Sequence, residues 1–352
     1  MSFFSAPKVL TMPAVGFDIS VDTVRFIELE EKNGKLVVSR FASQGFPPGV
    51  IAQGRINDRE KLRDVIKLLV KEYNLSFANV ALPEEQAYLA NMEIPTVSPK
   101  EMHDVIELKL EEYVPIKASD AIFDYVTVGD HHKETSKVVV SVLPSETVAE
   151  YLSVFEGTGL TPKSFEFESQ AMSRAIVPKE NTGTFLVIDI GKQITDIFVT
   201  AHGVVQFSAS LDFGGDHIST AIEKALKVSH EEAEALKVTH GLIGTAEYPT
   251  LRPAVLAAVG DLRARLMRHY SYWQTHHQDK TGGNIEGVFV TGGGANLNGL
   301  TEYLSMGLDV KVRIANPWVN VASFEEYIPP IHARASQGYA AAIGLALREF
   351  SS

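Results

Sequence analysis

The segment Leu186–Val199, which reads LVIDIGKQITDIFV, decides the fold that we expect for this chain. Most of its apolar residues are β-branched or aromatic, which favours strands, and Asp189 and Gly191 stand where the first strand ends. Glycine lets the backbone turn sharply, or approach a bound group closely, because it has no Cβ. The segment therefore predicts a β-hairpin with an acidic turn.

A near copy of this hairpin stands about half a chain earlier, at Val15–Glu28, with the sequence VGFDISVDTVRFIE. Asp18 occupies the place of Asp189, and Ser20 stands where the later copy has Gly191. Two hairpins with an aspartate at the same place indicate a duplicated unit. We expect the two acidic turns to face one cleft.

Composition sets the class of protein. A chain of 352 residues, 45% hydrophobic and 22% charged, has the make-up of a soluble globular protein with roughly two domains. The net charge of −12 argues against nucleic acid or anionic lipid as a primary partner. No cysteine is present, which excludes disulfides, thiolate metal sites and cysteine nucleophiles. The apolar run Ala340–Leu347 is far shorter than the roughly 20 residues of a membrane span.

Around the two hairpins, predicted strands alternate with amphipathic helices, which favours an α/β fold. Asn57, with Glu60 three residues later, predicts the start of a helix through a capping box. Residues from about 84 to 143 read as an insertion with its own small core. Its helix is predicted to begin at Ser98–Pro99–Lys100–Glu101, which combines a cap, a first-turn proline and a capping-box glutamate. The chain closes with a predicted helix at Ala335–Phe350.

Glycine pairs and triplets mark two further turns, Gly214–Gly215 and Gly292–Gly293–Gly294. A strand that runs into glycines and then a helix brings backbone N–H groups and the helix N-terminus close to a phosphate or an adenine. Each glycine turn alone is weak evidence, because such turns are common. The combination is more specific, since two acidic hairpins can hold hydrated Mg²⁺ between them while the glycines hold a nucleotide.

This combination resembles the actin-like ATPase superfamily, which includes actin, Hsp70, sugar kinases and FtsA. Further segments resemble the PilM family of cytoplasmic type IV pilus assembly proteins, and the resemblance runs from about Val15 to Arg348. These segments are Glu111–Pro115, Phe123–Tyr125, Leu143–Pro144, Gly159–Pro162, Glu166–Ser169, Gly214–Asp216, Glu231–Glu234 and, in the closing helix, Tyr339 with Ala342–Ala346.

The resemblance implies a duplicated actin-like, ribonuclease H-like α/β fold with an accessory subdomain of the FtsA and PilM type. The first core subdomain would comprise residues 1–83, 161–184 and the closing helix 335–352. The accessory subdomain would span about 84–160. The second core subdomain would comprise 185–215 and 281–334, with a helical subdomain at 216–280 on the nucleotide side.

The resemblance also implies a site for ATP or ADP with Mg²⁺. Asp18 and Asp189 would orient the water shell of the metal, and Glu234 and Lys237 would face the ribose and adenine, although such a pair read alone is a surface ion pair. The remaining contacts to the phosphates and the adenosine would come from Ser20, Gly191, Lys192, Gly214, Gly215, Gly292, Gly293 and Gly294.

The first hairpin departs from the family pattern, because Ser20–Val21–Asp22 stand where glycine and serines are usual. Valine removes a hydroxyl donor, and a carboxylate about 4 Å from a phosphate would repel it by roughly 4 kcal/mol before screening. Lys192 in the second hairpin would offset part of that charge. We therefore expect weakened or altered nucleotide binding and at most a weak ATPase, with no residue assigned as catalytic.

The family implies a partner as well, the short cytoplasmic N-terminus of a PilN-like inner-membrane protein, held in a groove near the accessory subdomain. The protein would then be cytoplasmic, peripheral to the inner membrane, with other pilus assembly proteins as partners and a second copy of itself as a further candidate. Neither nucleic-acid binding nor direct membrane insertion is expected. Two alternatives stay open: a polymerising FtsA-like filament protein, and a small-molecule kinase of the same fold.

Overall fold

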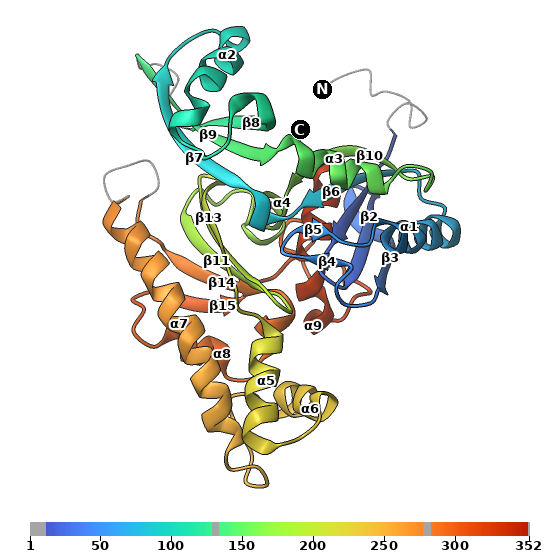
Figure 1. The fold of residues 1–352 in the computed structure, drawn as a ribbon, viewed down its shortest axis with the longest axis vertical. Helices are drawn as coiled ribbons and strands as arrows, with labels where there is room; N and C mark the ends of the chain where they lie inside the picture. The colour runs from blue at the N-terminus through green and yellow to red at the C-terminus, as the bar shows by residue number, and fades with distance from the viewer. Residues whose placement is uncertain (1–11, 129–133, 277–282, 351–352) are drawn as a thin grey trace.

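Two five-stranded sheets with the same plan form the body of the molecule, as the computed structural model of residues 12–128, 134–276 and 283–350 shows (Figure 1). In each sheet an antiparallel three-stranded meander is extended by two parallel strands. In order across the sheet, the first contains β3 (Lys35–Gly45), β2 (Thr23–Lys32), β1 (Val15–Ile19), β6 (Phe77–Leu82) and β10 (Thr161–Phe167). The second contains β13 (Val204–Leu211), β12 (Thr195–Ala201), β11 (Thr184–Ile190), β14 (Gly287–Thr291) and β15 (Lys311–Ile314).

Both predicted hairpins are confirmed, and they occupy the same place in the two sheets. Asp18 pairs with Arg25 across β1 and β2, and Asp189 pairs with Asp196 across β11 and β12. Strand β11 is buried along nearly its whole length, which explains its unbroken apolar sequence. Because an aspartate is the second-last residue of both central strands, the duplication brings two carboxyl groups to equivalent sheet edges.

Helices α1 (Arg59–Tyr73) and α3 (Ser145–Val154) cover the outer face of the first sheet. The predicted cap of α1 is wrong: Asp58, not Asn57, caps the helix, and its side chain accepts a hydrogen bond from the N–H of Lys61. The Asn57 amide instead donates to the carbonyl of Gly49. A neighbouring turn therefore decides which of two capping residues is used. A short hairpin of β4 (Ile51–Ala52) and β5 (Arg55–Ile56) precedes the helix.

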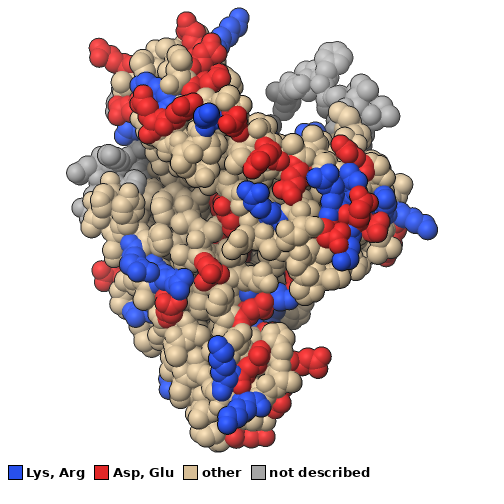
Figure 2. All heavy atoms as spheres, viewed as in Figure 1, with Lys and Arg blue, Asp and Glu red and all other residues tan. Residues whose placement is uncertain are grey.

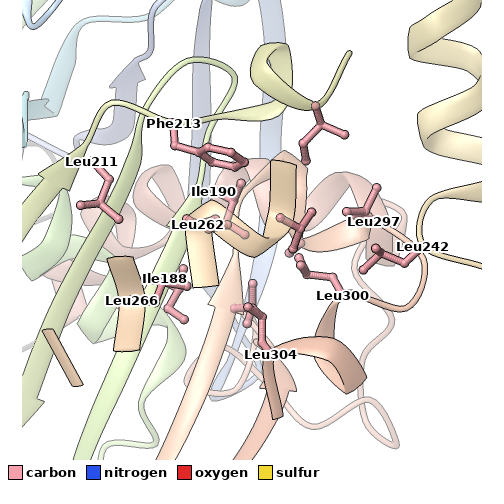
Figure 3. Close-up of a cluster of buried hydrophobic side chains, with 14 of the residues drawn as sticks. Ile188, Ile190, Leu211, Phe213, Leu242, Leu262, Leu266, Leu297, Leu300 and Leu304 are labelled. Atoms are coloured by element: carbon pink, nitrogen blue, oxygen red, sulfur yellow. The ribbon is translucent and has the colours of Figure 1, made fainter. Parts of the chain in front are cut away.

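The second sheet packs against four helices, α5 (Gly215–Leu226), α6 (His230–His240), α7 (Leu251–His276) and α8 (Leu300–Ser305). Figure 3 shows the centre of this core, where Ile188 and Ile190 meet leucines from α7 and α8. Helix α6 is capped by Ser229, whose hydroxyl accepts from the Glu232 N–H at 3.2 Å, and α7 begins at Leu251. We call this sheet and its helices the second lobe, and the first sheet with α1 and α3 the first lobe.

A third, smaller sheet has the strand order β7-β9-β8 and lies beside β13 at the top of Figure 1. Its strands are β7 (Tyr88–Pro95), β8 (Ala121–Val128) and β9 (Thr135–Pro144), and α2 (Pro99–Lys109) packs on one face around a core of its own. The predicted start of α2 is confirmed, because the Glu101 carboxylate accepts from the Ser98 N–H at 3.1 Å. Acidic side chains gather over α2 and β8 (Figure 2). We call this unit the accessory subdomain.

The end of the chain differs from the single helix expected at Ala335–Phe350. It forms α9 (Ala333–Ser336), a 3₁₀ turn at Gln337–Tyr339, α10 (Ala340–Leu347) and a second 3₁₀ turn. The Gln337 amide donates to the Ala315 carbonyl at 2.9 Å, so tertiary contacts stabilise the first turn.

None of the helices in the described part of the chain combines the length and the apolar character that a membrane span needs.

Helix α10 lies between β1 and α4 (Glu168–Ile176), and both helices fill the space between the two large sheets. Two glycines allow this close approach. A Cβ at Gly16 would overlap the carbonyl oxygen of Ala342, and one at Gly344 would overlap that of Ala171. Backbone therefore rests on backbone at two successive layers, which no other residue type permits.

We predict that Gly344→Ala lowers the free energy of unfolding by about 3 kcal/mol, because a backbone overlap cannot be relieved by a side-chain rotation. Gly260→Ala is the matched control. It makes the same change inside α7, where the nearest atom to a Cβ is the Tyr303 hydroxyl at 3.4 Å. The control should be neutral or stabilising by up to about 1 kcal/mol. Urea denaturation measures both, and equal stabilities of the two variants would contradict the prediction.

Candidate functional site

A cavity of about 490 Å³ opens between the two lobes, where the turns of the two duplicated hairpins face each other. The structure brings eleven of the twelve predicted site residues to its wall. They are Asp18, Ser20, Asp189, Gly191, Lys192, Gly215, Glu234, Lys237, Gly292, Gly293 and Gly294. Gly214 lies just behind the wall, where a Cβ would overlap the carbonyl oxygen of Lys192.

Asp18 and Asp189 form the floor of the cavity. The side chain of Asp18 is buried: its Oδ2 accepts from the Ser20 hydroxyl at 3.3 Å, and its Oδ1 has no partner within the described part of the chain. Burial raises the pKa of Asp18, although Arg25 and Ser20 oppose the shift. Burial and then the charge of Asp18 raise the pKa of Asp189 to about 7. A cation between these carboxylates would satisfy Oδ1 and favour both charged forms, so the pair fits a metal.

The three positions after β14 differ in why glycine occupies them. Gly292 has a φ of 79°, and a Cβ there would overlap the Asp189 carboxylate. A Cβ at Gly294 would overlap the side chain of Ile190. These two glycines are needed by the packing of the turn on β11. Nothing lies within 4 Å of a Cβ at Gly293, which lines the cavity, so packing gives no reason for glycine there. Gly293 is the glycine that a ligand could require.

The predicted pair Glu234 and Lys237 lies at the opposite end of the cavity, on α6. The Lys237 ammonium donates to Glu234 at 2.6 Å, to the Ser219 hydroxyl at 2.8 Å and to the Gly215 carbonyl at 3.1 Å. Its three protons therefore have acceptors inside the protein. The network ties α6 to the first turn of α5, and it leaves Lys237 as a positioning residue beside the cavity.

Lys192 and Asp22 meet across the cavity. The Lys192 ammonium lies 2.7 Å from a carboxylate oxygen of Asp22, and this hydrogen bond raises the pKa of Lys192. Burial raises the pKa of Asp22, but hydrogen bonds from Lys192 and Thr23 outweigh it and lower the value. Asp22, which departs from the family pattern, thus has Lys192 of the other hairpin as its partner.

Sequence reasoning missed several residues at this site. Arg25 lines the cavity and donates to Ser20 at 3.3 Å, and only the pairing of β1 with β2 places it beside Asp18. Glu168, at the start of α4, has carboxylate oxygens within 4.8 Å of those of Asp189 and Asp196. Burial, followed by neighbouring carboxylates, raises the pKa of both Glu168 and Asp196 well above the ordinary range.

Glu166, near the end of β10, behaves differently from Glu168, which begins α4. Its carboxylate is buried and accepts from Arg174 and Arg348, each at 2.6 Å. Glu166 is therefore neutralised and structural. Glu168 is the carboxyl group next to the cavity, and burial raises its pKa.

The charges that line the cavity are unbalanced. Six carboxylates (Asp18, Asp22, Glu168, Asp189, Asp216 and Glu234) face three cations (Arg25, Lys192 and Lys237). An anionic ligand would meet net repulsion unless a metal cation enters with it. The arrangement therefore suits a metal-bound anion better than a free one.

A second cavity, of about 560 Å³, lies where the first lobe, the second lobe and the accessory subdomain meet. We call it the hinge groove, because residues 177–181 of the link between the two sheets line it. Its apolar wall consists of Leu36, Val126, Val204, Val205, Leu347 and Phe350. Strand β8, an edge strand that pairs only with β9 among the described strands, contributes Asp124 and Val126.

Comparison with known proteins agrees with this architecture. A solved structure of the PilM–PilN type IV pilus biogenesis complex covers 97% of this chain and 99% of its own, with a TM-score of 0.82 and 23% identity. MreB5 of Spiroplasma citri bound to ADP covers 88% of this chain and 94% of its own, with a TM-score of 0.50 and 15% identity. These similarities confirm the actin-like fold that the sequence predicts.

Curated relatives match less of the chain. The cell division protein FtsA of Neisseria meningitidis serogroup B is 24% identical over 194 residues, 49% of this chain and 46% of that protein. The matched segments span about half the length of the first curated relatives. The family model described as type IV pilus assembly protein PilM, in contrast, matches residues 16–350. The chain therefore belongs to the PilM family of type IV pilus assembly proteins.

Proposed function

We propose that this protein is a nucleotide-binding scaffold of type IV pilus assembly, or of a related type II secretion machine, that binds the cytoplasmic N-terminus of a PilN-like inner-membrane protein. The observation that carries the proposal is the family match over residues 16–350. A scaffold that holds a ligand and a partner needs a site for each of them. This member of a pilus assembly family has two large cavities, which can serve as those sites.

The cavity between the lobes is the proposed site for ATP or ADP with Mg²⁺. The metal would neutralise the phosphates and link them to both lobes, through water held by Asp18 and Asp189. The phosphates would lie against Ser20, Gly191 and Lys192, with Gly214 and Gly215 at the start of α5. Gly292–Gly294 would face the adenosine, with Glu234 and Lys237 near its ribose. The unpartnered Oδ1 of Asp18 and the open space at Gly293 support this assignment.

Slow or absent hydrolysis fits the same cavity. Asp22 places a carboxylate near the proposed phosphates and holds Lys192 by an ion pair. We therefore propose at most weak ATPase activity.

The hinge groove is the proposed site for the partner peptide. Its wall combines apolar side chains with the free backbone edge of β8, and an extended peptide can use both. Glu166 is already neutralised by Arg174 and Arg348, so the groove offers Asp124 and Lys179 for polar contacts. Bound in this way, the protein would be cytoplasmic and peripheral to the inner membrane.

We also propose that the accessory subdomain spans residues 84–144 instead of 84–160. The core around the three-stranded sheet ends at Val142, whereas Tyr151 and Val154 of α3 pack with Phe17 and Val80 of the first sheet. The other subdomain limits are proposed as expected from the sequence. Residues 1–11, 129–133, 277–282 and 351–352 within these limits lie outside the described residues.

The raised pKa of Asp189 predicts a pH dependence that tests the metal site. Metal-dependent binding of ATP should weaken as the pH falls through about 7, because the carboxyl group becomes protonated. Without metal, folding stability should instead fall as the pH rises from about 4 to about 7 and then level off, since the folded protein holds the proton more tightly than the unfolded chain. Calorimetric titration of Mg-ATP between about pH 6 and pH 8 and thermal unfolding between about pH 4 and pH 8 measure the two effects.

The variant Asp189→Asn separates these effects. At about pH 8 without metal it should stabilise the fold by roughly 2 kcal/mol, because it removes a poorly solvated charge. It should also abolish stabilisation by Mg-ATP. Asp216→Asn is the control, since its carboxylate lies in the first turn of α5 and its loss should lower stability slightly. A destabilised Asp189→Asn variant that still binds Mg-ATP would refute the proposed site.

For the hinge groove, we predict that a labelled peptide of about 20 residues from the N-terminus of a PilN-like protein binds the full chain. Val126→Asp and Val204→Asp should each weaken binding about tenfold or more, because a charge would face an apolar wall. Ile328→Asp, at a residue that is 81% exposed and outside the groove, should leave it unchanged. Fluorescence anisotropy measures the affinities, and equal losses in all three variants would count against the groove.

A further inference from the structure

We propose that Asp22 acts as an internal substitute for a nucleotide phosphate: it holds Lys192 across the cleft and ties the lobes together until a bound nucleotide takes Lys192 from it. The inference rests on the proposed nucleotide site and adds a means of regulating it. It starts from an ion pair that spans the mouth of the cavity.

The ion pair joins residues 170 positions apart in the sequence, one on each hairpin turn. Asp22 lies in the turn between β1 and β2, and Lys192 lies in the turn between β11 and β12. Lys192 Nζ and Asp22 Oδ2 are 2.7 Å apart, with side-chain exposures of 42% and 28%. Since each turn belongs to a different lobe, the pair connects the lobes directly above the floor formed by Asp18 and Asp189.

Further hydrogen bonds hold the Asp22 carboxylate and the backbone at Lys192 in place. Exchange of the ion pair therefore needs only a movement of the Lys192 side chain. The second carboxylate oxygen of Asp22 accepts from the Thr23 hydroxyl at 2.8 Å. The backbone of the other turn is tied to the start of α5, because the Gly215 N–H donates to Gly191 O at 3.0 Å and the Asp216 N–H donates to Lys192 O at 2.9 Å. The Lys192 side chain can therefore turn from Asp22 to a ligand while its backbone stays in place.

Lys192 is the lining cation best placed for such an exchange. Lys237 has three internal acceptors, and Arg25 belongs to the first lobe and donates to Ser20. Lys192 has Asp22 as its acceptor among the described residues. It is therefore the second-lobe cation whose partner a phosphate could replace.

The energetics favour replacement by a phosphate. A partly exposed ion pair contributes little net stability, because each charge loses good solvation when the pair forms. A phosphate carries more negative charge than a carboxylate and offers more acceptor atoms to the ammonium group. After the exchange Asp22 is left without its cation and faces the phosphate, which repels it. The nucleotide should thus both break the link between the turns and push the turn of the first lobe away.

The first experiment measures the distance between the lobes without nucleotide. The chain contains no cysteine, so Lys71→Cys in α1 and Ala235→Cys in α6, both exposed, can be spin-labelled specifically. In this background, Asp22→Asn and Lys192→Gln should each broaden and lengthen the distance distribution, and the double variant should show no further change. Lys35→Gln is the control, since it breaks an exposed ion pair with Glu326 outside the cavity. An unchanged distribution in both cleft variants would overturn the proposal.

The second experiment measures Mg-ATP affinity by calorimetry in the same variants. Asp22→Asn should bind about fivefold more tightly, because the competitor is gone, and Lys192→Gln should bind less tightly. In the Lys192→Gln background, the gain from Asp22→Asn should fall below about twofold. An undiminished gain there would show that Asp22 acts by repulsion alone and would overturn the exchange.

The two experiments also separate this inference from the function on which it rests. If no variant binds Mg-ATP, the proposed nucleotide site fails, whatever the distances show. Suppose instead that Mg-ATP binds, but the distance distributions stay unchanged in the cleft variants and the gain from Asp22→Asn is undiminished in the Lys192→Gln background. The nucleotide site then stands, and the exchange of Lys192 fails.

Discussion

The close contact of α10 with β1 on one side and α4 on the other is the constraint on which the rest of the structure depends. Gly16 and Gly344 let three backbone segments stack without side chains between them. This stack connects the two large sheets through one continuous core. It also determines the site, because Asp18 follows Gly16 on β1, Glu168 begins α4, and Ala340 and Ala341 of α10 line the cavity. A looser stack would separate carboxylates that now lie within a few ångströms of one another.

Bringing those carboxylates together is unfavourable in the absence of a cation. Burial raises the pKa values of Asp18, Glu168, Asp189 and Asp196, and repulsion from neighbouring carboxylates adds to the shift in the last three, which favours their protonated forms. Proteins retain such groups mostly where a ligand compensates them. The close packing of backbone segments and the apolar cores in both lobes offset this unfavourable electrostatic free energy. The fold is thus stable enough to keep a cleft in which several carboxyl groups lie close together.

Helix α4 relates the two cavities. Glu168 and Met172 face the cavity between the lobes, whereas Gln170, Ser173 and Arg174 line the hinge groove. The Ser173 hydroxyl also donates to Thr200 of the second sheet at 2.9 Å, so one short helix contacts both lobes and both cavities. The groove includes residues 177–181 of the link between the lobes, and Asn320 bonds to the carbonyls of Arg174 and Val177 beside it. A rotation of the lobes would therefore change the shape of the groove.

Local chemistry explains which features could be predicted. The two hairpins, the capping box at Ser98, the cap at Ser229 and most strand positions follow from residues that are neighbours in sequence. The cap at Asn57 and the single closing helix were wrong, because contacts with Gly49 and Ala315 compete with the local preference. Arg25, Glu168 and Asp196 were assigned no role from the sequence, since each is an ordinary charged residue until strand pairing and helix packing bring it to the cavity or to the carboxyl groups beside it.

The sequence by itself determined the duplicated hairpins, the glycine turns and the alternation of strands and helices, because backbone preferences and apolar periodicity act over a few residues. Only the tertiary structure decided which charged side chains interact with one another. It paired Lys192 with Asp22, enclosed Lys237 in a network with Glu234, and gave Glu166 and Glu168 different surroundings on the same segment. The physical reason is that charges interact through space, over distances that the order of residues along the chain does not specify.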